Sequence, residues 1–182
     1  MEPPTTTSTN RAAAQDLKQL CARAIQVMAT NDLPDFASVY HPRATNQEAD
    51  HEPAACRQSG PAAFRATALW LRAAFADLSW QINSVVAEGD LVVVHASMSG
   101  RYIGPFVTYD LAGAVESAMP PTGKQFSVAE THWFRLADGQ VIDHWANRDD
   151  LTMAKQLGWV PPSPLFLLRM ALAKNRARRA SV

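Results

Sequence analysis

The stretch KQFSVAETHWFRLADGQVIDHWANR, residues 124–148, consists of two alternating runs joined by Asp138-Gly139. Alternation of apolar and polar residues with a period of two predicts half-buried β-strands, and an Asp-Gly pair between them predicts a tight hairpin. In the first run, the even-numbered positions from Phe126 to Leu136 are apolar except for Glu130 and His132. An apolar wall with a few polar groups is typical of a small-molecule pocket. The hairpin therefore predicts a sheet whose inner face carries a site.

The turn allows two registers, which differ in the residues that face the pocket. A type I turn with a bulge at Gly139 places these pairs opposite each other: Leu136 and Gln140, Phe134 and Ile142, His132 and His144, Glu130 and Ala146. A two-residue type I′ turn pairs Ala137 with Gln140 and directs the alternate side chains inward: Asp143, Trp145 and Asn147. We favour the bulged register.

Outward from this hairpin, the sequence predicts helices first and strands afterwards. Three helices are expected near the start: one from Arg11, capped by Asn10, a short one stopped by Pro42, and one from Pro61 whose apolar stripe extends to Leu78. Period-two runs predict four long antiparallel strands: 78–89, 90–103, 124–137 and 140–148. A short strand is expected within 44–50, a long irregular insert at 104–124, and a short helix at 149–159.

This order is typical of an α+β fold and not of alternating βαβ units. We expect a cone-shaped roll, in which a curved antiparallel sheet wraps around the N-terminal helices and leaves a central pocket. The cone domain is expected to span residues 10–160. A disordered tail at 1–9 precedes it, and an amphipathic helix with a basic tail at 161–182 follows it.

The bulk composition indicates one folded domain without an obvious charged partner. The 182 residues are 47% hydrophobic, and 17 basic residues balance 17 acidic ones, which gives no reason to expect nucleic acid. No apolar run reaches the length of a membrane helix, and the first residues lack the pattern of a secretory signal. Cys21 and Cys56 lack metal-ligand spacing and are expected to be buried thiols in a reducing compartment. We therefore expect a cytoplasmic protein.

Segments 60–94, 120–145 and 149–159 together resemble the nuclear-transport-factor-2-like cone fold. More specifically, they resemble its SnoaL-like polyketide cyclase family, over roughly residues 15–160. The resemblance implies acid/base chemistry without a cofactor on a hydrophobic small molecule, and a homodimer. The superfamily also contains isomerases, dehydratases and pure ligand binders, so the fold does not select the function.

One position departs from the family's pattern. Polyketide cyclases of this family use an aspartate as general acid/base immediately after the His-Trp pair of the last strand, together with a histidine on the preceding strand. That histidine corresponds to His132, whereas the acid falls on position 146, which is alanine. In the bulged register Glu130 lies across from Ala146 and could supply the carboxylate, and an apolar wall would raise its pKa.

The resulting hypothesis is an enzyme that removes a proton next to a carbonyl and so catalyses cyclisation, isomerisation or dehydration. Glu130 is the expected base and His132 the group that polarises the substrate oxygen, with His144 as a third catalytic candidate. Substrate contacts are expected from ten residues: Tyr40, Asn46, Glu48, Trp70, Phe75, Arg101, Tyr102, Phe134, Ala146 and Arg148. Neither a metal nor a cofactor is expected. The alternative is a ligand-binding protein that has lost the acid at position 146. Three residues are expected on the outer face of the sheet, at a dimer contact: Trp133, Asp143 and Trp145.

Overall fold

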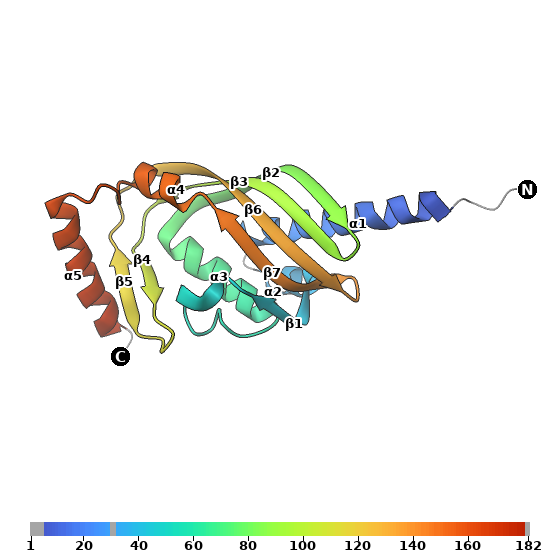
Figure 1. Cartoon of the computed structure of the whole chain (residues 1–182). Helices are drawn as coiled ribbons and strands as arrows, with labels where there is room; N and C mark the ends of the chain where they lie inside the picture. Colours follow the sequence, from blue (N-terminus) through green and yellow to red (C-terminus); the bar gives the residue numbers. More distant parts are fainter. Residues whose placement is uncertain (1–5, 30–31, 181–182) are drawn as a thin grey trace, which may run out of the picture.

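The computed structural model describes residues 6–29 and 32–180. Three helices lie against one side of a curved five-stranded sheet (Figure 1). The helices are α1 (Thr6–Gln26), α2 (Leu33–Val39) and α3 (Pro61–Ala74). The strands are β1 (Tyr40–Asn46), β2 (Phe75–Glu88), β3 (Leu91–Tyr102), β6 (Gln125–Ala137) and β7 (Gln140–Arg148), in the spatial order β1-β7-β6-β3-β2. The α+β fold expected from the sequence is confirmed.

The four long strands β2, β3, β6 and β7 are antiparallel to one another, as predicted. The short strand β1 runs parallel to β7. The main core lies between the helices and the concave face of the sheet. Its fully buried members come from every layer: Cys21 and Ala24 of α1, Phe36 and Val39 of α2, Ala68 of α3, Val92 and Val94 of β3, and Val141 of β7. Burial of these side chains provides the main stabilisation of the fold.

Two predicted helix boundaries were wrong. Helix α1 begins at Thr6 and not after Asn10, since neither proline nor glycine interrupts residues 5–26. Residues 6–9 of the expected disordered tail are thus helical, and its first five residues lie outside the described residues, as do the last two residues of the basic tail. Helix α3 ends at Ala74, and the alternating burial that starts at Phe75 places the rest of the expected stripe on β2.

The insert at 104–124, predicted to be irregular, contains a hairpin of β4 (Phe106–Tyr109) and β5 (Val115–Met119). β4 consists entirely of β-branched and aromatic residues, and the Asp110 carboxylate accepts a hydrogen bond from the Ala114 amide within the connecting turn. After β7 the chain forms α4 (Asp150–Leu157), and then α5 (Pro164–Ala180), which lies beside β5 (Figure 1). None of the helices in residues 6–29 and 32–180 is long and apolar enough to cross a membrane.

The β6–β7 hairpin combines features of both predicted registers. Asp138 and Gly139 both have positive φ, and Ala137 pairs with Gln140, which is the two-residue turn that we did not favour. A bulge at Ile142 then shifts the register by one residue. The shift reverses the faces of β7, so that His144 and Ala146 share the inner face with β6 as expected, whereas Val141 and not Ile142 occupies the inner position nearer the turn.

Candidate functional site

A cavity of about 450 Å³ lies between the helices and the concave face of the sheet. Its apolar wall is largely aromatic and includes Phe64, Trp70, Phe75, Trp80, Phe106 and Phe134. Polar groups converge on it from β1, β6 and β7 and from the loop before α3. Both the volume and this composition are typical of a small-molecule site.

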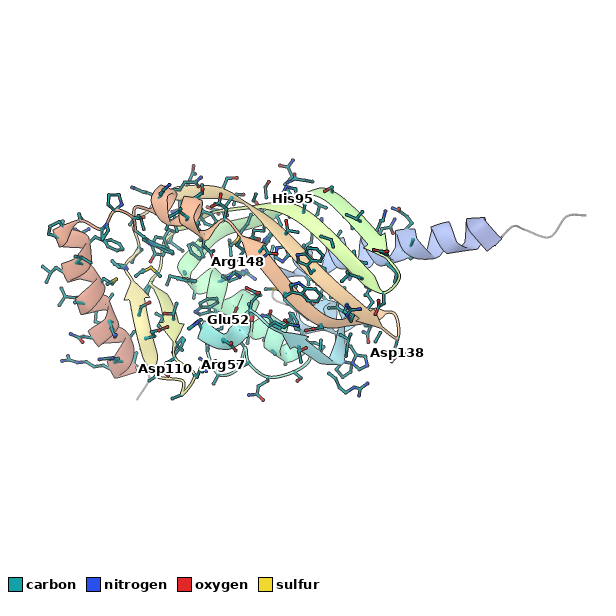
Figure 2. The ribbon with its side chains drawn as sticks, viewed as in Figure 1. Glu52, Arg57, His95, Asp110, Asp138 and Arg148 are labelled. Carbon is teal, nitrogen blue, oxygen red and sulfur yellow. The ribbon has the colours of Figure 1, made fainter. Side chains whose placement is uncertain are left out.

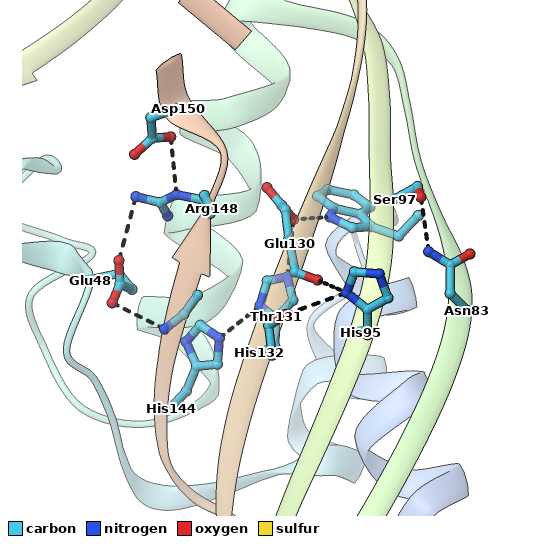
Figure 3. A network of polar contacts seen from close by, with 12 residues as sticks. Glu48, Asn83, His95, Ser97, Glu130, Thr131, His132, His144, Arg148 and Asp150 are labelled. Atoms are coloured by element: carbon cyan, nitrogen blue, oxygen red, sulfur yellow. Dashed lines mark hydrogen bonds and ion pairs between the residues drawn. The ribbon is translucent and has the colours of Figure 1, made fainter. Parts of the chain in front are cut away.

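Glu130 is the buried carboxylate of the sheet wall. Its side chain is 3% exposed, and Oε2 accepts a hydrogen bond of 3.0 Å from the indole N–H of Trp80 on β2. The same oxygen lies 3.0 Å from Nε2 of His132 (Figure 3). Among the contacts of the described residues, the second oxygen, Oε1, has no partner. The carboxylate is thus fixed through one oxygen and has the other available to a ligand.

A chain of hydrogen bonds extends from Glu130 to β1. His132 Nδ1 lies 3.0 Å from His144 Nε2, and His144 Nδ1 lies 2.9 Å from Asn46 Oδ1. The Glu48 amide also donates to Asn46 Oδ1 at 3.2 Å, which identifies that atom as the acceptor. His144 Nδ1 therefore carries a hydrogen.

The protonation of His144 follows from its surroundings. Removal from water, followed by the nearby charges of His132 and Arg148, holds the pKa of His144 well below 6.5. A neutral His144 with its hydrogen on Nδ1 has a lone pair on Nε2, and so it accepts from His132 Nδ1–H. Both ring nitrogens of His132 are thus engaged within the protein, Nδ1 with His144 and Nε2 with Glu130. This geometry places His132 between His144 and Glu130, where it fixes the Glu130 side chain, and the predicted role of His132 as polariser of a substrate oxygen stays a prediction.

We expect His144 to remain neutral at pH 6, with the proton on Nδ1, because the pKa of His144 is lowered and Asn46 accepts at that nitrogen. Nitrogen NMR of histidine-labelled protein measures both properties. Asn46→Asp is the matched variant: a carboxylate at the same place stabilises the imidazolium and should raise the pKa of His144. An Nε2-protonated or charged ring at pH 6 in the wild type would contradict this assignment.

The residue opposite Ala146 on β6 is not the one that we expected from the sequence. Ala146 pairs with His132, and Glu130 pairs with Arg148, so that Glu130 is diagonal to Ala146 and not opposite it. A different carboxylate reaches this position: Glu48 Oε1 accepts from the Ala146 amide at 3.1 Å. Arg148 is held between Glu48 Oε2 at 3.4 Å and Asp150 at 3.5 Å (Figure 3).

Most of the predicted site residues line the cavity. They are Tyr40, Asn46, Glu48, Trp70, Phe75, Glu130, His132, Phe134, His144 and Arg148. Arg101 does not, because its guanidinium is near the carboxylate of Asp77 on the exposed side of the sheet. Tyr102 does not either, since its ring is buried in a second cluster with Phe75 and Phe126, and its hydroxyl donates to the carbonyl of Met119.

The outer face of the hairpin carries a stacked tryptophan pair. The rings of Trp133 and Trp145 are 6.1 Å apart and nearly parallel. Asp143, expected at the same dimer contact, instead accepts hydrogen bonds from Thr45 and Gln47 of its own chain. Homodimer formation through the tryptophan pair stays a prediction.

A second buried carboxylate, Glu52, lines the same cavity and was not predicted from the sequence. It lies in the loop between β1 and α3, is 5% exposed, and accepts a hydrogen bond from the Thr67 hydroxyl of α3. Burial raises the pKa of Glu52 from 4.5 to about 7, although the hydrogen bond from Thr67 and the charge of Arg148 lower it. Cavity carboxyls with displaced pKa values are candidates for acid/base chemistry.

In the described part of the chain, no group of three or more His, Cys, Asp or Glu side chains is placed to hold a metal ion. Cys21 and Cys56 are both buried and do not form a disulfide with each other.

The profile of the SnoaL-like polyketide cyclase family matches residues 18–157. The chain belongs to this family. It is 30% identical over 148 residues to aklanonic acid methyl ester cyclase DnrD of Streptomyces peucetius, an alignment that covers 80% of this chain and 92% of the relative.

Solved structures agree on the fold. TsrD from Streptomyces laurentii superposes with a TM-score of 0.63 at 26% identity, covering 79% of this chain and 96% of TsrD. A protein with a ketosteroid isomerase-like fold from Catenulispora acidiphila superposes with a TM-score of 0.56 at 13% identity, covering 77% of this chain and 92% of that one. The sequence-based assignment to the SnoaL-like family and its cone fold is confirmed.

Proposed function

We propose that the protein is a polyketide-cyclase-like enzyme that removes a proton next to a carbonyl group of a hydrophobic, oxygenated small molecule. The observation that carries the proposal is the carboxylate of Glu130, which is buried in an aromatic cavity and held through Oε2 by Trp80 and His132. Its second oxygen faces the cavity without a partner among the described residues and is available as a base.

The cavity supports a polycyclic or aromatic polyketide as the substrate class. Its aromatic walls match a flat, apolar skeleton, and its polar groups gather on the side of β1 and β7, where they can bind oxygens. The relative DnrD acts, by its name, on aklanonic acid methyl ester. We take a compound of this kind as the first substrate to test.

The proposed reaction is an intramolecular aldol cyclisation. Glu130 removes a hydrogen from the carbon next to one carbonyl, and the C–H electron pair passes into an enolate. The enolate carbon then attacks a second carbonyl carbon, a C–C bond forms, and the electrons of that C=O bond move onto its oxygen, which takes up a proton. Isomerisation and dehydration begin with the same proton abstraction, so the choice among the three depends on the substrate.

Turnover of aklanonic acid methyl ester tests the proposal. Chromatography separates the cyclised product from its isomeric substrate, and mass spectrometry in heavy water detects exchange of the hydrogen that the base removes. The enzyme should produce the cyclised isomer or, with a related ketone that cannot cyclise, exchange that hydrogen. Recovery of unexchanged substrate from a saturated complex would contradict the proposal.

That contradicting result would favour a second candidate function, a protein that binds such molecules without converting them. The specific observation in its favour is Ala146, which lacks the carboxylate that the cyclases carry beside the equivalent of His132. In a binding protein, the Glu130–His132–His144–Asn46 chain would only satisfy buried polar groups.

A further inference from the structure

The sheet wall provides a base, but a cyclisation also needs a proton donor for the oxygen that becomes negative. Neither ring nitrogen of His132 is free for this task, because His144 and Glu130 occupy them. Arg148 is bound between Glu48 and Asp150. Among the described residues that line the cavity, the other buried acid is Glu52, which comes from the loop between β1 and α3, whereas Glu130 comes from the sheet (Figure 2 labels Glu52 and Arg148).

Burial favours a Glu52 carboxyl that keeps its proton, and it outweighs the hydrogen bonds from the Thr67 hydroxyl and the Cys56 thiol, which favour the ionised form. Oε2 accepts from Thr67, and none of the ion pairs between described residues includes Glu52. The charged and titratable groups that act on it are Arg148 of β7, Glu48 before the loop, and the thiol of Cys56 within the loop. The Arg57 guanidinium is directed to the backbone carbonyls of Glu52 and of the β4–β5 turn and not to the carboxyl.

We propose that Glu52, in its neutral form, donates a hydrogen bond and then a proton to the substrate oxygen on which negative charge develops. The inference rests on the proposed function. In the aldol step, Glu130 gains the proton from the carbon, and the alkoxide takes the proton from the Glu52 hydroxyl as the C–C bond forms. The step leaves Glu130 neutral and Glu52 ionised, and exchange with solvent restores both. Two carboxyls in different environments thus divide the acid and base roles.

Binding of fluorenone, a neutral tricyclic ketone that does not titrate, tests the donor without turnover. Trp70, Trp80 and Trp159 line the cavity, so that quenching of tryptophan fluorescence reports binding. Since the pKa of Glu52 is about 7, the neutral donor becomes about tenfold scarcer between pH 6 and pH 8. Wild-type affinity for fluorenone should fall by a similar factor over this range. Glu52→Gln keeps an N–H donor and should bind equally at both pH values, whereas Glu52→Leu should bind weakly at both.

Glu130→Gln is the matched control, because it removes the other buried carboxyl of the same cavity. It should retain the pH dependence of fluorenone binding. A fall that persists in Glu52→Gln, or a wild-type affinity that does not change with pH, would overturn the inference.

The turnover assay separates this inference from the function on which it rests. With Glu52 as the donor, the turnover rate of the wild type should decline above about pH 7. If the wild type converts the ester, and Glu52→Gln converts it at the same rate with the same decline, Glu52 is not the donor and the cyclase proposal stands. If wild-type protein binds fluorenone with the expected pH dependence and converts nothing, the cyclase proposal fails and the Glu52 hydrogen bond stands.

Discussion

Replacement of Glu130 by glutamine is expected to lower kcat for the proposed cyclisation by about 10²–10⁴-fold, the usual contribution of a general base. The amide has nearly the shape of the carboxylate and can still accept from Trp80, so the ligand affinity should change little. Two quantities are measured for the wild type and the variant: kcat with aklanonic acid methyl ester, and the dissociation constant of fluorenone. A large loss in kcat without a loss in binding assigns Glu130 to the chemistry.

Glu48→Gln provides the comparison, because Glu48 is a carboxylate of the same cavity that contacts the amide of Ala146 and the guanidinium of Arg148. Both Glu48 oxygens have partners, whereas Glu130 Oε1 has none among the described residues. We expect a loss of less than about tenfold. If instead Glu48→Gln abolishes turnover and Glu130→Gln does not, the base is Glu48, which lies beside the position where the cyclases carry their aspartate.

The fold could be predicted from the sequence because its periodicities are long and regular. The alternation in β6 correctly separates the inner residues, Glu130 and His132 among them, from the outer ones. The helix–strand change at Phe75 could not be located, because the apolar stripe of α3 runs into an alternating strand without a proline or glycine between them. Such a boundary depends on tertiary contacts, here the pairing of Phe75 with Tyr102.

The hairpin shows how a correct face can follow from a wrong register. The prediction placed one extra residue in the turn, whereas the structure has a two-residue turn and places the extra residue at Ile142. Both arrangements direct His144 inward, since each adds one residue to the chain between Leu136 and His144. They differ in the opposing residues, and for this reason Glu130 is diagonal to Ala146 and not across from it.

Glu52 was missed because a loop residue has no periodic pattern that indicates its direction. The available signal was Thr67, a polar residue within the apolar stripe of α3. A buried hydroxyl requires a hydrogen-bond partner, and here the partner is Glu52. Which loop residue would supply that partner depended on the path of residues 47–60, which the sequence does not specify.

The carboxyl group of Glu52 should make the folded state less stable as the pH rises. The pKa of Glu52 is about 7 in the folded protein and 4.5 as its ordinary value, so the folded state holds the proton more tightly than the unfolded state does. Stability therefore falls as the pH increases through this interval, and the full cost of ionising the buried group is reached above about pH 7. A difference of this size corresponds to about 3 kcal/mol.

Glu52→Gln removes this titration, and the free energy of unfolding of the variant relative to wild type should rise by about 2–3 kcal/mol between pH 5 and pH 8. Denaturant unfolding at each pH measures it, and Glu88→Gln, at an exposed glutamate of β2, should show no such trend. His144 contributes the opposite slope, because its pKa is lowered in the folded protein, but it is present in all three proteins and cancels in the comparison. A difference that does not change with pH would mean that Glu52 is ionised in the folded state at pH 5, and an ionised Glu52 could not donate a proton to a substrate oxygen. A buried acid whose ionisation weakens the fold near neutral pH, and which has no ion pair among the described residues, is a candidate for proton transfer.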